Sequence, residues 1–145
     1  IAHVRAGKLR SIQQTGSKDI DAGGGKIMPS VGNFLPGIKN QLPFSGIYNL
    51  AVRRSVPKAI IGKIEKAFVA GVNSPAFAAI AKKKFFEIDI RTGKAADRRA
   101  AQVESITAAT FEKLGVKGSH AGSELGLPTP AGFDKWWPPP GYKPL

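Results

Sequence analysis

The segment Gly46-Ile47-Tyr48-Asn49-Leu50-Ala51-Val52 is apolar and β-compatible, and it is followed by Arg53-Arg54-Ser55-Val56-Pro57. Because proline is well tolerated in the first turn of a helix, Pro57 predicts a helix that starts directly after a strand. Apolar residues then recur at helical spacing, at Ile60, Ile61, Ile64, Phe68 and Val72. The segment therefore predicts a strand that leads into an amphipathic helix with one face packed against other structure.

Two further helices and a second strand are predicted up to Gly115. Ser74-Pro75 is an N-cap followed by proline at the first helical position. The alternation in Phe86-Glu87-Ile88-Asp89-Ile90-Arg91 predicts a short strand, and a long helix begins at Thr92 or Gly93 and has Gly115 as its C-cap. The helix after Ser74-Pro75 carries Phe77, Ile80, Ala81 and Phe85 on its apolar side, and the long helix carries Val103, Ile106, Thr107, Thr110, Phe111 and Leu114 on its apolar side. This order of elements indicates an α/β fold.

The regions on either side are less regular. Leu9–Thr15 is predicted as a strand from its context, and Gly16–Lys26 as a surface loop, since Gly23-Gly24-Gly25 is free to adopt positive φ. A phosphate-binding loop is excluded there because Lys26 is followed by Ile27-Met28-Pro29 and not by Ser or Thr.

The end of the chain is rich in Gly, Ser, Pro and aromatic residues. Both tryptophans lie in Phe133-Asp134-Lys135-Trp136-Trp137-Pro138-Pro139-Pro140-Gly141-Tyr142, a composition that favours polyproline II over helix. Two interpretations stay open: a tail held across the body of the protein by its aromatic residues, or a docking segment for a partner chain.

Four phrases occur in a fixed order along the chain. They are His3-Val4-Arg5-Ala6-Gly7-Lys8-Leu9-Arg10 with the turn Thr15-Gly16-Ser17, then Met28-Pro29-Ser30-Val31-Gly32-Asn33-Phe34-Leu35-Pro36-Gly37, then Gly46 to Pro57, and finally Phe111-Glu112-Lys113-Leu114-Gly115-Val116-Lys117 with Ser123-Glu124-Leu125-Gly126-Leu127-Pro128. Together they resemble the C-terminal part of the extracytoplasmic solute receptors of tripartite tricarboxylate transporters, also called Bug receptors. The resemblance extends over most of the chain.

The resemblance implies the C-terminal portion of a two-lobed, periplasmic-binding-protein-like α/β fold. Residues 1–45 correspond to the end of the second lobe and residues 46–55 to a hinge or crossing strand. Residues 56–117 correspond to the return into the first lobe, and residues 118–145 form a Pro/Gly/Trp-rich tail. Such receptors are periplasmic, capture a small organic carboxylate between their lobes without a cofactor, and deliver it to the subunits of a membrane permease.

The start of the chain predicts that part of the fold is missing. Ile1-Ala2-His3-Val4-Arg5-Ala6 opens inside an apparent helix without an initiator methionine. We therefore expect that a missing N-terminal portion or another chain completes the fold. On this interpretation five apolar side chains are not all buried within the chain alone: Ile60, Ile64, Phe68, Ile106 and Phe111.

The candidate ligand site is the loop Thr15-Gly16-Ser17, which follows the predicted strand Leu9–Thr15. Open α/β sheets usually bind ligands at the carboxyl ends of their strands. According to the resemblance, the carboxylate is held by backbone N–H groups, Ser/Thr hydroxyls and bridging waters. The alternative is an ordinary turn at the end of a strand. The family's main Gly-rich anion loops would lie upstream of Ile1.

The charge supports a rival function. The formal net charge is +12, and Arg53-Arg54, Lys82-Lys83-Lys84 and Arg98-Arg99 are candidate phosphate contacts of a basic nucleic-acid-binding protein. However, the basic residues are scattered over every element, and aromatic residues are not interleaved with them on one strand face. We therefore expect no nucleic-acid partner and keep this function as the alternative.

Enzymatic activity has little support in the sequence. The only histidines, His3 and His120, lie near opposite ends of the chain, and no cysteine is present. We find no pattern of acidic residues typical of a metal site or a glycosidase, and no nucleophile elbow. The sequence predicts a binding protein without catalytic residues, metal or cofactor.

Overall fold

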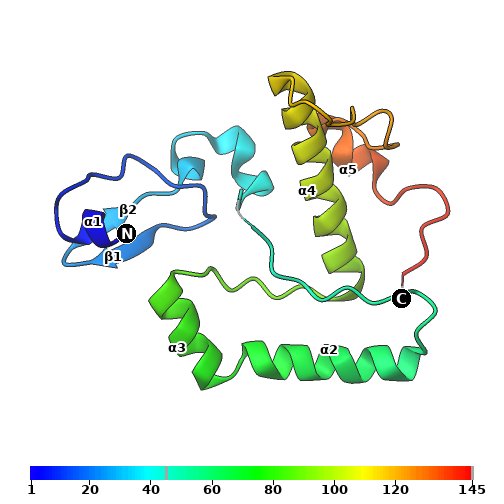
Figure 1. The fold of residues 1–145 in the computed structure, drawn as a ribbon, viewed down its shortest axis with the longest axis horizontal. Coiled ribbons are helices and arrows are strands. Elements are labelled where there is room, and N and C mark those ends of the chain that lie inside the picture. The colour runs from blue at the N-terminus through cyan, green and yellow to red at the C-terminus, as the bar shows by residue number, and fades with distance from the viewer. Residues whose placement is uncertain (45, 145) are drawn as a thin grey trace. The chain divides into compact units, whose positions relative to one another are not determined.

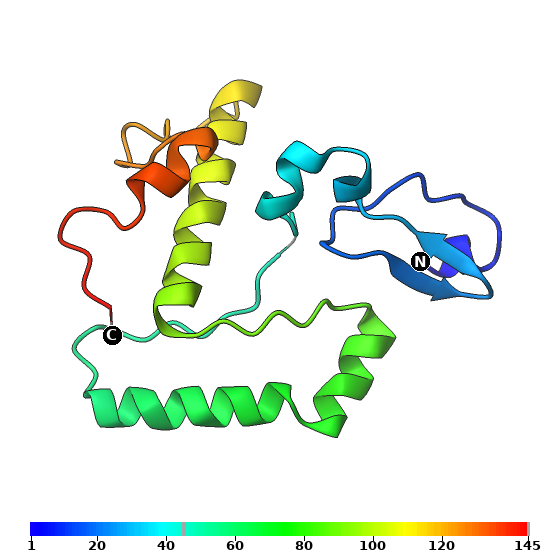
Figure 2. The ribbon, with the colours of Figure 1, turned by 180° about the vertical axis from the view of Figure 1, so that it is seen from behind.

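The computed structural model describes residues 1–44 and 46–144, which form two compact units (Figures 1 and 2). The first unit contains Ile1–Ala51 and Asn73–Ile88, and the second contains Val52–Val72 and the chain from Asp89 onward. Residues 45 and 145 lie outside the described residues; they are the last residues of the predicted segments 1–45 and 118–145.

The first unit contains a small antiparallel hairpin. Strands β1 (Ile20–Gly23) and β2 (Lys26–Met28) pair with Ile20 opposite Met28. Gly24 and Gly25 join them at φ values of 64° and 70°, the left-handed region that a tight hairpin turn requires. The prediction of a loop over Gly16–Lys26 was therefore wrong for its second half, because the adjacent glycines allow the chain to reverse and pair with itself.

Short helices complete this unit. They are α1 (Ala2–Arg5), the 3-10 helices η1 (Val31–Asn33) and η2 (Pro36–Gln41), and α3 (Pro75–Lys84). The Ser74 side chain accepts a hydrogen bond of 3.2 Å from the Phe77 N–H, which confirms the predicted cap and helix start. The buried side chains of the unit are Ala22, Met28, Ser30, Val31, Leu42 and Ala81.

The second unit is helical. Helix α2 spans Lys58–Val72 and α4 spans Gly93–Leu114, followed by the 3-10 helix η3 (Pro130–Gly132) and α5 (Phe133–Trp136). Gly115 caps α4 at a φ of 63°, as predicted. The three predicted helices between Val56 and Gly115 are thus confirmed. The described helices include none that is both long and apolar enough to cross a membrane.

The predicted strands did not form. Within the part of the chain that the structure describes, residues 46–52 and 86–91 are in no strand, and Leu9–Thr15 contributes a single bridge, between Gln14 and Ser30. A strand requires a neighbouring strand for its N–H and C=O groups, and residues 46–52 and 86–91 pair with no strand among the described residues. The observed architecture is a mixture of helices and one two-stranded sheet, only loosely α/β.

Helix α2 buries none of its residues. On its apolar face Ile60 is 45% exposed, and Ile64 and Phe68 are half-buried. On α4, Ile106 is half-buried and Phe111 is 42% exposed. None of these five side chains is buried within the described chain, as expected.

The aromatic tail begins with a helical turn, so the extended conformation predicted from Phe133 is wrong for its first four residues. The Thr129 hydroxyl accepts a hydrogen bond of 3.2 Å from the Gly132 N–H and caps the turn before α5. The Phe133 ring lies 5.9 Å from the Trp136 ring and 6.0 Å from the Trp137 ring, between centroids. These contacts fit a tail held on its own unit, although the buried Trp137 Nε1 has no hydrogen-bond acceptor among the described residues, which leaves the docking interpretation open.

The tail is joined to α4 by a titratable contact. The Tyr142 hydroxyl donates a hydrogen bond of 2.8 Å to Asp97 Oδ2. Burial raises the pKa of the Tyr142 phenol above its ordinary value of 10.0, and the hydrogen bond and charge of Asp97 add to this effect against the opposing charge of Arg54. The folded state therefore favours the protonated phenol.

We predict that this contact is lost at high pH. A group whose pKa is raised by folding stabilises the protein below its unfolded pKa, here about 10, and loses that contribution as the pH rises through the folded pKa. In a Tyr48→Phe background, the tyrosinate absorbance should appear above pH 10, and Asp97→Asn should shift its midpoint downward. A midpoint that is unchanged in Asp97→Asn would contradict the contact.

Candidate anion-binding site

The predicted site loop is a bend between the bridge at Gln14 and strand β1. Backbone hydrogen bonds of 2.8 Å join Gln14 N to the Pro29 oxygen and Val31 N to the Gln14 oxygen. These bonds attach the start of the loop to the segment that follows β2. The loop is therefore held in place although the strand predicted before it is absent from the described residues.

Thr15 positions the loop. Its hydroxyl donates a hydrogen bond of 2.9 Å to the Phe44 carbonyl oxygen, and the Phe44 N–H donates one of 2.9 Å to the Thr15 oxygen. The hydroxyl proton is thus already used within the protein. Thr15 supports the neighbouring residues and offers no donor of its own to an anion in this arrangement.

Gly16 is enclosed on both sides. Its N–H donates to the Gln14 side-chain oxygen, and its carbonyl oxygen accepts a hydrogen bond of 2.7 Å from the buried Ser30 hydroxyl. A Cβ at this position would lie 2.6 Å from Gln14 Oε1 and 3.4 Å from Glu87 Oε2. The absence of a side chain therefore lets Gln14 and Glu87 approach the backbone closely.

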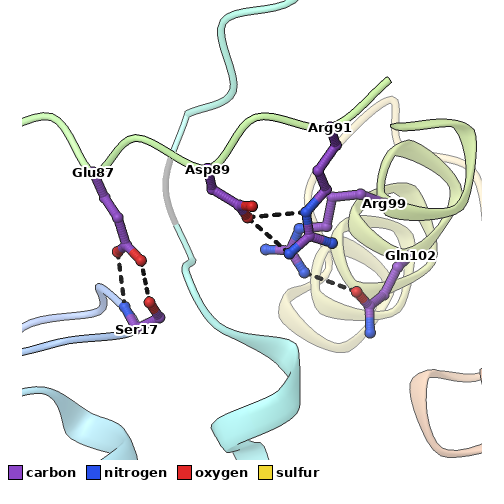
Figure 3. A network of polar contacts seen from close by, with 6 residues as sticks. All are labelled: Ser17, Glu87, Asp89, Arg91, Arg99 and Gln102. Atoms are coloured by element: carbon purple, nitrogen blue, oxygen red, sulfur yellow. Dashed lines mark hydrogen bonds and ion pairs between the residues drawn. The ribbon is translucent and has the colours of Figure 1, made fainter. Parts of the chain in front are cut away.

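Ser17 holds a carboxylate of the protein itself. Its N–H donates a hydrogen bond of 3.0 Å to Glu87 Oε2, and its hydroxyl donates to Glu87 Oε1. Figure 3 shows the Glu87 carboxylate facing Ser17 with each oxygen on one of these two donors. The predicted loop thus presents an N–H and an O–H in the arrangement that a carboxylate requires, and an internal carboxylate occupies it.

A surface depression of about 570 Å³ lies next to this contact, with Glu87 in its lining. Four cationic side chains line it: Arg5, Lys18, Lys82 and Lys83. Besides Glu87, two further carboxylates line it, and both are hydrogen-bonded within the hairpin region. Asp19 accepts hydrogen bonds of 2.8 Å from Ser30 N and from Asn33 Nδ2, and Asp21 accepts one of 2.7 Å from Gly23 N. The lining therefore carries four cationic side chains against three carboxylates, and one of these carboxylates, Glu87, is the one that Ser17 binds.

The second unit contains a separate charged network, also drawn in Figure 3. Arg91 forms an ion pair of 2.7 Å with Asp89, and the buried Arg99 donates a hydrogen bond of 2.8 Å to Gln102 Oε1. Burial lowers the pKa of the Arg99 guanidinium, the charge of Arg91 lowers it further, and Asp89 opposes them. Arg98 is paired with Asp134. Both members of the Arg98-Arg99 pair are thus engaged within the protein.

His120 has a polar contact with a carboxylate on the surface. His120 Nδ1 lies 3.1 Å from Glu124 Oε2 on the protein surface. Among residues 1–44 and 46–144, no group of three or more His, Asp or Glu side chains could hold a metal ion.

Sequence reasoning proposed the loop Thr15-Gly16-Ser17 as the site and did not include Glu87 or Ser30, which contact it. Glu87 is 70 residues from Ser17 and was predicted only as part of the short strand Phe86–Arg91. No local signal connects the two residues, whereas Ser30 could have been noticed as a possible cap in the segment Met28–Gly37.

Comparison of the chain with protein-family models, curated proteins and solved structures finds no significant match.

Proposed function

We propose that the chain is part of an extracytoplasmic solute-binding receptor that captures a small organic carboxylate and delivers it to a membrane permease. In this proposal the chain is the C-terminal portion of a two-lobed, periplasmic-binding-protein-like fold. The observation that carries the proposal is the pair of Ser17 donors, which hold the carboxylate of Glu87.

The chemistry at Ser17 supports a carboxylate ligand. Hydrogen bonds to an ionised acceptor are stronger than those between neutral groups, and a pair that engages both oxygens also fixes the orientation of the carboxylate. Glu87 stands in for the carboxylate of a solute. The donors need no metal or cofactor to bind an anion.

The charge near the loop supports an anionic ligand. Arg5, Lys18, Lys82 and Lys83 line the depression beside Glu87, and the whole chain carries a formal charge of +12. Clustered positive charge raises the local concentration of anions and speeds their association. Arg5 is also oriented, because its Nε donates a hydrogen bond of 2.6 Å to the Ala22 carbonyl oxygen.

The apolar face of α2 supports a further polypeptide partner. An amphipathic helix of 15 residues with no buried side chain presents an apolar surface that another part of a receptor can cover. We propose that a missing N-terminal portion or another chain fills this role in the periplasm.

The proposal predicts stabilisation by organic acids. In a thermal-shift screen of the complete protein against mono-, di- and tricarboxylic acids, a ligand at 100 times its dissociation constant should stabilise by about 2.7 kcal/mol. Ser17→Ala should weaken the binding about tenfold, because a hydrogen bond to a charged group is lost. Ser123→Ala, on the exposed surface, should leave the binding unchanged.

The same preparation distinguishes the alternative function. Duplex or single-stranded DNA should show only weak retention that disappears as salt is added. Tight DNA binding that persists at high salt, without a response to any acid, would replace the proposed function with nucleic-acid binding.

A further inference from the structure

We propose that Glu87 is an internal competitor for the carboxylate site, so that a solute binds only after the Glu87 side chain has left Ser17. This inference rests on the proposed function, since it concerns the same pair of donors.

The competition follows from the number of donors. Both Glu87 oxygens are bound, one by the Ser17 N–H and the other by the Ser17 hydroxyl. Each donor has a single proton, so a solute carboxylate can take both hydrogen bonds only if Glu87 gives them up. Two carboxylates side by side would also repel each other, because like charges in contact are unfavourable. The two carboxylates therefore exclude each other.

The surroundings of Glu87 allow it to move. It lies in the segment after α3, which forms no helix or strand from Phe86 to Arg91. Its neighbours Phe86 and Ile88 are 40% and 45% exposed. The segment is attached by a backbone hydrogen bond of 2.9 Å from Phe86 N to the Ala81 oxygen and by the contact between the Phe86 and Tyr48 rings, 5.3 Å between centroids. None of these contacts involves the Glu87 side chain, so its release leaves them in place.

Competition lowers the apparent affinity in a defined way. When Glu87 leaves Ser17 free in only a fraction of the molecules, the apparent dissociation constant for the solute equals its intrinsic dissociation constant divided by that fraction. Removing Glu87 should therefore tighten binding, whereas removing a true ligand-binding residue would weaken it. This opposite sign distinguishes a competitor from a contact residue.

The test is an acetate titration of the complete protein, observed at the Ser17 amide by NMR. Glu87→Ala should bind acetate about tenfold more tightly than the wild type, which corresponds to about 1.4 kcal/mol. Glu87→Gln should lie between them, because the amide oxygen still accepts a hydrogen bond but carries no charge. Asp21→Asn removes the same charge from the same depression without a contact to Ser17. It should tighten binding less than about twofold, since salt screens the field of an exposed charge.

A measurement without ligand tests the contact itself. In Glu87→Ala the Ser17 amide should exchange its hydrogen faster than in the wild type, because its acceptor is gone. Unchanged exchange would overturn the inference. Equal acetate affinity at Ser17 in the wild type and in Glu87→Ala would also overturn it, but would leave the proposed function standing. No acetate response at Ser17 in any variant would overturn both.

Discussion

Replacing Phe133 with alanine should destabilise the second unit by about 3–5 kcal/mol, the usual cost of truncating a buried phenylalanine. Phe133 is 2% exposed and is the largest of the fully buried side chains. Its ring contacts Trp136 and Trp137, and the Arg98 guanidinium lies 5.3 Å from the ring centroid. The substitution removes the ring that these groups share and leaves a cavity within the second unit.

Chemical denaturation monitored by tryptophan fluorescence measures this effect. Both tryptophans of the chain lie in the cluster around Phe133, so the signal reports on the unit that is changed. Leu114→Ala is the control in the same unit, because Leu114 is 71% exposed and its loss should change the free energy of unfolding by less than about 0.5 kcal/mol. Equal effects of the two substitutions would show that the cluster does not stabilise the unit.

Arg99→Ala should destabilise the same unit by about 2–3 kcal/mol. The Arg99 side chain is 6% exposed, and its guanidinium donates a hydrogen bond to Gln102 Oε1. The substitution therefore removes both the buried aliphatic stem of Arg99 and a hydrogen bond from a charged donor. Burial lowers the pKa of the Arg99 guanidinium, the charge of Arg91 lowers it further, and the charge of Asp89 opposes both effects. The guanidinium nonetheless remains charged at neutral pH.

Two further variants separate these contributions. Arg99→Met keeps most of the stem and should cost less than Arg99→Ala, because a buried charge can be replaced by a well-packed apolar group with little loss. Arg53→Ala removes the same charge from an exposed position and should change the unfolding free energy by less than about 0.5 kcal/mol. A loss in Arg53→Ala as large as in Arg99→Ala would attribute the effect to net charge instead of to the buried network.

The candidate site was only partly predictable. The loop Thr15-Gly16-Ser17 was proposed because it follows a predicted strand, and its carboxylate chemistry was implied by the family resemblance. The occupant could not be recognised, because Glu87 reaches Ser17 through a contact between residues 70 positions apart. Thr15 was placed in the site by its hydroxyl, yet that hydroxyl donates to Phe44, a partner that is also distant in the sequence.

The sequence by itself determined where α3 begins and where α4 ends. Ser74-Pro75 and Gly115 act on the backbone groups next to them, so their effect needs no distant partner. Tertiary structure decided which β-compatible segments became strands and which side chains were buried. Residues 46–52 have the composition of a strand but no neighbour among the described residues, whereas the hairpin formed because Gly24 and Gly25 return the chain onto itself. Phe133 is buried because its tail folds back onto α4, where Tyr142 bonds to Asp97. Local capping is encoded by adjacent residues, while pairing and burial depend on what the rest of the chain brings alongside.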